Sequence, residues 1–123
     1  MTYEPITYFS VEDINNAIKN NDIQKLELIP LSVGEYCMNW RKGQKLCLLF
    51  LKKYDTERIR ANAVLGLSYI ARNHRRLDKW KVLSFLKKEY KTNKKFCGII
   101  CNAIEDIFLF LHWKKPKWWI DKD

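Results

Sequence analysis

The sequence has few residues that break helices and no apolar run long enough to span a membrane. Glycine occurs four times and proline three times among 123 residues, which fits helices because both residues are unfavourable inside them. The longest apolar runs, at 46–51 and 107–111, fall far short of the roughly 20 residues of a membrane helix. Residues 1–5 lack the basic start and apolar stretch of a signal peptide. We therefore expect a cytoplasmic protein without a membrane partner.

Motifs for metal binding are also scarce. No two cysteines have the two-residue gap of a zinc or redox motif, and the only histidines, His74 and His112, are not placed with them. Free cysteine behaves as a small buried hydrophobe. We expect no metal and no cofactor, and reduced cysteines in the core at Cys37, Cys47, Cys97 and Cys101.

Catalytic motifs are missing as well. The sequence has no glycine-rich phosphate loop, nucleophile elbow or metalloprotease helix. Glu105 and Asp106 are the only adjacent acids deep inside an apolar helix, but adjacent helical residues point about 100° apart and do not face each other. We expect one of them to brace neighbouring backbone or to meet a partner, and we expect no enzyme activity.

Charge is abundant and unevenly distributed. The chain has 23 lysines and arginines against 14 acidic residues, a net charge of +9. Residues 1–39 carry a net charge of −4 and residues 40–123 a net charge of +13. A basic body favours an anionic partner, either protein or nucleic acid. A solvated lysine surface explains the same composition equally well.

Apolar periodicity predicts helices along the whole chain and no sheet. Ser10 is expected to cap a first helix, and Asp22 to cap a short second one that ends near Leu28 because Pro30 stops it. A third segment is predicted from Ser32 to Trp40. The later helices are predicted at 43–54, 57–73, 79–90 and 96–113.

Two segments of the chain repeat with an offset of 37 residues. Residues 59–70 and 96–107 match in large apolar, small and isoleucine positions, and the helix before each contains Phe-Leu-Lys-Lys. Two helices per unit at this period are typical of a helical solenoid. Small residues such as Ala63 and Gly66 would let the second helix of a pair pack closely. We predict an all-α fold, a short right-handed α-solenoid of HEAT-like antiparallel helix pairs.

The predicted fold is a single domain in three parts. Residues 1–39 form acidic N-terminal helices, residues 40–113 form two HEAT-like repeats, and residues 114–123 form a basic, tryptophan-rich tail. Three possibilities remain open for the tail. It folds back and buries its tryptophans, or it joins a protein interface, or it touches nucleic acid or membrane headgroups.

Residues 40–113 resemble a family of small bacterial HEAT-repeat proteins. The resemblance lies in Cys-Leu-Leu-Phe-Leu-Lys-Lys-Tyr-Asp at 47–55, Arg-Ala-Asn-Ala-Val-Leu-Gly-Leu-Ser-Tyr-Ile-Ala-Arg at 60–72, Leu-Asp at 77–78 and Glu-Asp-Ile-Phe-Leu-Phe-Leu-His-Trp at 105–113. Members of this family resemble immunity proteins of contact-dependent growth inhibition and other polymorphic toxin systems. The resemblance implies a cytoplasmic protein, monomeric before complex formation, that binds and neutralises a cognate toxin domain.

One feature departs from that pattern. Immunity proteins against nucleases are often acidic because they cover a basic active site, whereas this chain is basic. The alternative function is a nucleic-acid-binding helical-repeat module, which the charge alone favours. A DNA-repair enzyme ranks third, because the chain is short for wrapping a duplex and flipping a base.

The helix predicted at 57–73 carries a second stripe of side chains beside its core stripe. The residues of this second stripe are spaced four and three positions apart. We expect this stripe and its equivalent in the next repeat to lie on the concave side, where mixed polar and aromatic side chains are typical of interface anchors. A solvated helix face is the alternative. The predicted partner-binding residues are Arg58, Asn62, Tyr69, Arg72, Asn102, Glu105, Asp106 and Trp113.

Overall fold

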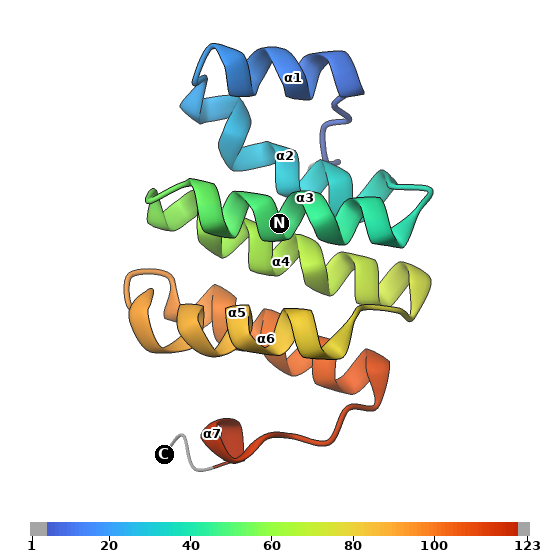
Figure 1. The fold of residues 1–123 in the computed structure, drawn as a ribbon, viewed down its shortest axis with the longest axis vertical. Helices are drawn as coiled ribbons and strands as arrows, with labels where there is room; N and C mark the ends of the chain where they lie inside the picture. The colour runs from blue at the N-terminus through green and yellow to red at the C-terminus, as the bar shows by residue number, and fades with distance from the viewer. Residues whose placement is uncertain (1–4, 121–123) are drawn as a thin grey trace.

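The structure, a computed structural model, describes residues 5–120, and these form seven helices without a strand (Figure 1). The prediction of an all-α protein is confirmed, and the helices pack as a small bundle. Residues 1–4 and 121–123, which include part of the predicted tail, lie outside the described residues. The helices are α1 (Val11–Lys19), α2 (Ile23–Tyr36), α3 (Trp40–Lys53), α4 (Glu57–His74), α5 (Lys79–Thr92), α6 (Cys97–Leu111) and α7 (Lys117–Ile120).

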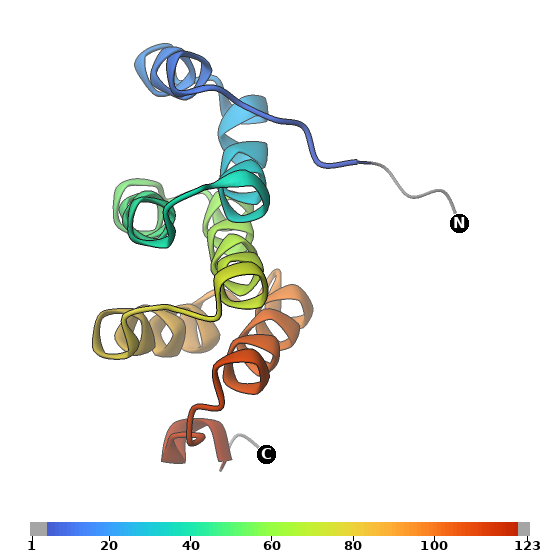
Figure 2. The ribbon, with the colours of Figure 1, turned by 90° about the vertical axis from the view of Figure 1, so that its right-hand side faces the viewer.

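The helices lie in two layers. Figure 2 shows α2, α4 and α6 in one layer and α1, α3 and α5 in the other. Helix α4 packs against α2, α3 and α6, while α7 lies at the end of the molecule below α5 and α6 (Figure 1). Within residues 5–120, no helix is both long and apolar enough to cross a membrane.

Helix α4 is the centre of the core. Its predicted core stripe is confirmed, because Ile59, Ala63, Gly66, Leu67 and Ile70 are all buried. Further residues on other sides of the helix are also buried, because neighbouring helices cover α4 on more than one side. These additional buried residues are Ala61, Val64, Ser68 and Ala71.

The backbones of α2 and α4 touch where two glycines meet. A Cβ atom added to Gly34 would lie 2.4 Å from the carbonyl oxygen of Gly66, and one added to Gly66 would lie 2.4 Å from the carbonyl oxygen of Pro30. Both distances are far below van der Waals contact, so no side chain fits at either position. The prediction that Gly66 allows close packing is confirmed, but the neighbour is α2, which lies outside the repeated segments.

The predicted break at Pro30 is wrong. Helix α2 is continuous from Ile23 to Tyr36 with Pro30 inside it, so the expected separate segment from Ser32 to Trp40 does not exist. An internal proline costs about 3 kcal/mol because it lacks an N–H group and crowds the preceding turn. Burial of Leu26 and Ile29 against the core offsets this cost, and the tertiary contact overrides the local preference.

Helix starts were predicted more accurately. Ser10 and Asp13 form a reciprocal capping box on α1, and the Asp22 carboxylate accepts a hydrogen bond from the backbone N–H of Lys25 at 3.3 Å. Each cap satisfies N–H groups that have no partner within the first turn. The caps at Ser10 and Asp22 are therefore confirmed.

The repeated positions are only partly equivalent. Leu51 and Leu86 of the two Phe-Leu-Lys-Lys segments are both buried, as are Gly66 and Ala103. The matched pair of Ala61 and Gly98 is not equivalent, because Ala61 is fully buried and a Cβ added to Gly98 would meet no atom within 4 Å.

The contact between α2 and α4 predicts that Gly66→Ala destabilises the protein. The added methyl group meets backbone that cannot move aside, so we expect a loss of about 2 kcal/mol in the free energy of unfolding, despite alanine's better helix propensity. Gly98→Ala is the matched control and should raise stability by up to about 1 kcal/mol. Urea denaturation measures both, and a Gly66→Ala protein as stable as the unsubstituted chain would contradict the contact.

Candidate functional site

The predicted stripes are the least buried sides of α4 and α6. Arg58 and Arg72 are exposed on α4, with half-buried residues between them, and Asn102 and Asp106 are exposed on α6. Helix α2 continues this surface in the same layer (Figure 2). We call it the α2/α4/α6 face, made of Leu28, Leu31, Glu35, Arg58, Asn62, Leu65, Tyr69, Arg72, Ile99, Asn102, Asp106 and Leu109.

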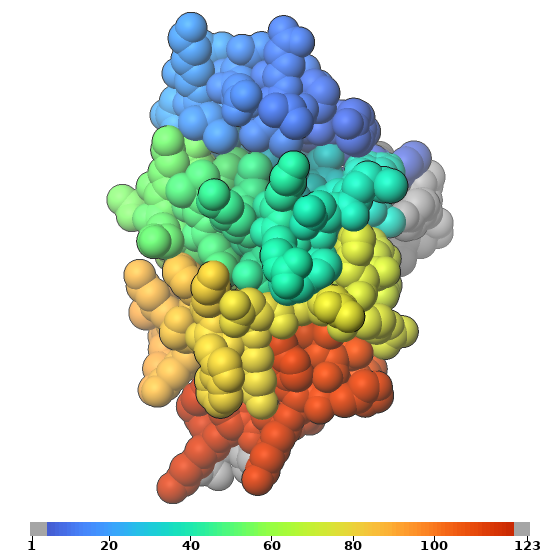
Figure 3. Space-filling model, turned by 45° about the vertical axis from the view of Figure 1, so that its right-hand side comes forward, coloured from blue at the N-terminus to red at the C-terminus, as the bar shows by residue number. Residues whose placement is uncertain are grey.

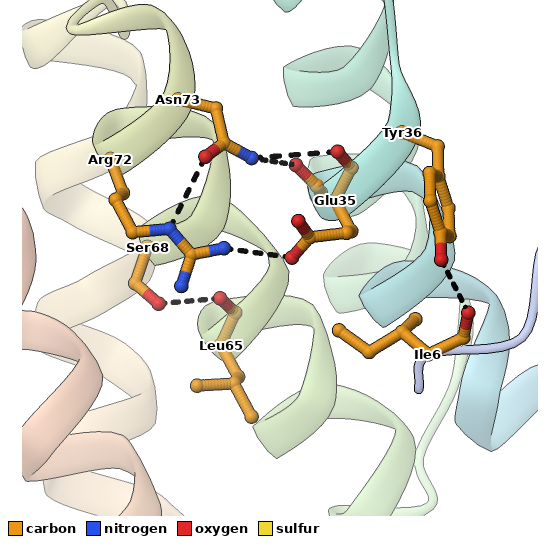
Figure 4. A network of polar contacts seen from close by, with 8 residues as sticks. Ile6, Glu35, Tyr36, Leu65, Ser68, Arg72 and Asn73 are labelled. Atoms are coloured by element: carbon orange, nitrogen blue, oxygen red, sulfur yellow. Dashed lines mark hydrogen bonds and ion pairs between the residues drawn. The ribbon is translucent and has the colours of Figure 1, made fainter. Parts of the chain in front are cut away.

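Several side chains of the α4 stripe bind α2. The Asn62 side-chain amide donates a hydrogen bond to the Glu27 carbonyl oxygen at 2.7 Å. Arg72 Nη2 donates to Glu35 Oε2 at 2.7 Å, as Figure 4 shows. The Asn73 amide donates to the carbonyl oxygens of Gly34 and Glu35 at 3.3 and 3.4 Å. This part of the stripe therefore holds the two helices together as well as forming their outer surface.

Tyr69 and Arg72 form a fixed pair on the face, close to the C-terminal ends of α2 and α4. The guanidinium carbon of Arg72 lies 4.8 Å from the centre of the Tyr69 ring. Asn73 Oδ1 accepts a hydrogen bond from Arg72 Nε at 3.2 Å, and Glu35 accepts the second one (Figure 4). Three contacts thus orient the arginine, yet its side chain remains 42% exposed.

Glu105 does not join this group of residues. Its carboxylate accepts hydrogen bonds from Lys115 Nζ at 2.5 Å and from the indole nitrogen of Trp119 at 2.7 Å. Trp119 is 2% exposed and contacts the rings of Tyr90 and Phe108. Of the three possibilities for the tail, the fold-back is therefore the one observed for Trp119, and Glu105 braces it. The short helix α7 was not predicted.

Trp113 lies away from the α2/α4/α6 face. It lines a hollow of about 320 Å³ at the corner between α4 and α5. None of the other lining residues belongs to the face, so the structure divides the predicted site residues among three places. The hollow is lined by Trp40, Arg75, Arg76, Leu77, Leu111 and Trp113.

Positive charge is concentrated in the other layer. Helix α3 carries five lysines and arginines and no acidic residue, and α5 carries five lysines and one acidic residue, Glu89. Glu89 is buried and forms an ion pair with Arg60 at 3.1 Å, so it does not offset the surface charge. Helices α2, α4 and α6 together contain five acidic and four basic side chains. The sequence did not reveal this separation.

A groove of about 720 Å³ runs along α3 and the beginning of α5 (Figure 3). Sequence analysis missed it, because a gap between two helices leaves no pattern in the chain. Its basic side chains are Arg41, Lys42, Lys45, Lys52 and Lys81, and its apolar side chains are Trp40, Leu46, Leu48 and Leu49.

All four cysteines are free, but only Cys47 is fully buried, and the expectation that all lie in the core is wrong for the exposed Cys97. His74 Nε2 lies 2.9 Å from the Cys37 carbonyl oxygen and 3.7 Å from its sulfur, so a histidine does lie beside a cysteine. Burial raises the pKa of the Cys37 and Cys47 thiols, which disfavours the reactive thiolate. Within residues 5–120, no group of three or more His, Cys, Asp or Glu residues is arranged to hold a metal ion.

Comparisons with family models, with curated proteins and with solved structures find no match to this chain. The resemblance of residues 40–113 to HEAT-repeat immunity proteins therefore stays a prediction. Function is inferred from the surfaces of the molecule itself.

The tail contact predicts different effects for two adjacent acids. Glu105→Ala leaves the buried Trp119 N–H without this acceptor, so we expect a loss of about 1–3 kcal/mol in unfolding free energy. We also expect tryptophan emission to shift to the red as the tail detaches. Asp106→Ala, the neighbouring exposed control, should cost under about 0.5 kcal/mol. Equal effects of both changes in urea denaturation followed by fluorescence would contradict the brace.

Proposed function

We propose that this protein is an immunity protein that binds a cognate toxin domain through the α2/α4/α6 face and neutralises it. It acts in the cytoplasm, as a monomer before the complex forms. Neutralisation follows from stoichiometric binding and needs no catalysis. The proposal specifies the toxin domain only as the protein that this face binds.

The fixed pair of Tyr69 and Arg72 carries the proposal. Tyrosine and arginine are enriched among the residues that dominate binding energy at protein interfaces. An exposed arginine that is already oriented by Glu35 and Asn73 loses little conformational freedom when a partner binds. The pair is therefore suited to anchor a protein partner.

The surroundings of the pair also favour a protein partner. Leu28, Ile99 and Leu109 are exposed apolar residues of the same face, and Asn102 and Asp106 add polar groups. Protein interfaces combine apolar contact with polar groups in this way. The near balance of acidic and basic residues on α2, α4 and α6 makes the face unsuited to a polyanion.

The proposal includes a stacked architecture. Helices α1 and α2, α3 and α4, and α5 and α6 are taken as three HEAT-like antiparallel pairs in a short right-handed solenoid. The second helix of each pair lies in the same layer (Figure 2), which supports this assignment. On this assignment the N-terminal helices are a pair of their own, although they lack the repeated sequence pattern.

A second candidate function is nucleic-acid binding. The basic layer of α3 and α5 favours it, because lysine and arginine bind phosphate groups without sequence preference. Such binding falls steeply as salt rises, since each phosphate contact releases a counterion. Tight binding to a random duplex at physiological salt would favour this candidate over the immunity function.

The proposed function predicts rescue of poisoned cells. In toxin systems of this kind, the immunity gene lies beside a gene for a large exported protein with a variable C-terminal domain. We expect that producing that C-terminal domain in a bacterial host stops growth, and that producing this chain with it restores growth. Growth curves and calorimetric titration of the two purified proteins measure the effect and the one-to-one binding.

The interface is tested with the double change Tyr69→Ala and Arg72→Ala. Loss of both anchors should weaken binding to the toxin domain by more than about tenfold, while the exposed ion pair to Glu35 contributes only about 0–1 kcal/mol of stability. The control is Asn15→Ala with Asn16→Ala, exposed on α1. Unchanged binding of the anchor variant in calorimetry would place the interface elsewhere.

A further inference from the structure

We infer that the groove between α3 and the beginning of α5 is a second docking site, which binds an acidic protein segment that carries one or two large apolar side chains. This inference goes beyond the proposed function. The groove belongs to the layer opposite the α2/α4/α6 face (Figures 2 and 3), so its occupant leaves that face open.

Charge complementarity identifies the occupant as acidic. The groove residues Lys45 and Lys52 are exposed on α3. Among residues 5–120, Asp78 is the only acidic residue that lines the groove. The Asp78 carboxylate caps α5 by accepting the backbone N–H of Lys81 at 3.4 Å. Asp78 also forms an ion pair with Lys81 Nζ at 3.9 Å. Within residues 5–120, no ion pair is formed by the other four cations of the groove, Arg41, Lys42, Lys45 and Lys52. An acidic segment supplies the partners that these four lack.

The apolar lining indicates a protein rather than a nucleic acid. Leu46 and Leu48 are half-buried, and Leu49 is 47% exposed, so the groove offers aliphatic surface to an apolar anchor. Sites for single-stranded nucleic acid instead use aromatic platforms on which bases stack. Trp40 is the only aromatic lining residue in the described part of the chain, and the Arg41 guanidinium already lies 4.8 Å from the centre of its ring.

The dimensions and position of the groove agree with this occupant. A volume of about 720 Å³ accommodates a short segment with its anchoring side chains. Helix-in-groove and extended-segment recognition both place apolar side chains in a groove and charged side chains along its edges.

The test selects peptides on the full chain from a displayed library of random twelve-residue sequences. We expect the selected peptides to be acidic and to contain Leu, Ile, Phe or Trp. Lys45→Glu with Lys52→Glu, which reverses charge in the groove, should weaken their binding at least tenfold. The matched control is Lys87→Glu with Lys91→Glu, which makes the same charge change on exposed residues of α5 outside the groove.

Each of the following three results would overturn the inference. Selection without acidic, apolar-containing peptides would show that the groove does not recognise them. Equal weakening by both variant pairs would show that only diffuse charge attracts the peptides. Tighter binding of a 25-nucleotide single strand, lost in the Lys45→Glu, Lys52→Glu variant, would assign the groove to nucleic acid. Growth rescue by that variant is measured separately, so failure of the immunity function is distinguishable from failure of this inference.

Discussion

The structure depends on the direct backbone contact between α2 and α4. Gly34 and Gly66 bring the two helices so close that a single methyl group at either position would collide with the other backbone. This approach buries α4 between α2, α3 and α6. It also places the Glu35 carboxylate and the Gly34 carbonyl within reach of Arg72 and Asn73, so the polar contacts on the surface follow from the packing beneath them.

Two surfaces with different chemistry result from this packing. The layer of α2, α4 and α6 is nearly neutral and presents the oriented pair of Tyr69 and Arg72. Helices α3 and α5 carry ten of the 23 lysines and arginines against one acidic residue, and they form a groove with aliphatic surface. The net charge of +9 is therefore unevenly distributed between the two layers of helices. This separation is what allows the proposed protein partner to meet a nearly neutral face on a basic protein.

Local signals in the sequence predicted the helical fold, the caps at Ser10 and Asp22 and the buried core stripe of α4, because each is set by residues within a few turns. Features that depend on residues far apart in the chain were missed or predicted wrongly. Pro30 predicted a helix end, yet burial of α2 outweighs its local cost. Glu105 was placed in the interface, but the returning tail binds it. The groove lies between α3 and the beginning of α5, which are far apart in the chain, so no local pattern predicts it.

Native-state hydrogen exchange tests the central role of the α2–α4 contact most directly. If the two helices form one cooperative unit, their interior amides exchange only on global unfolding and report the same opening free energy. Amides of α1 and α7, at the two ends of the bundle, should exchange at lower free energies. Exchange of α2 at a distinctly lower free energy than α4 and α6 would contradict the account, because the N-terminal helices would then open separately from the core.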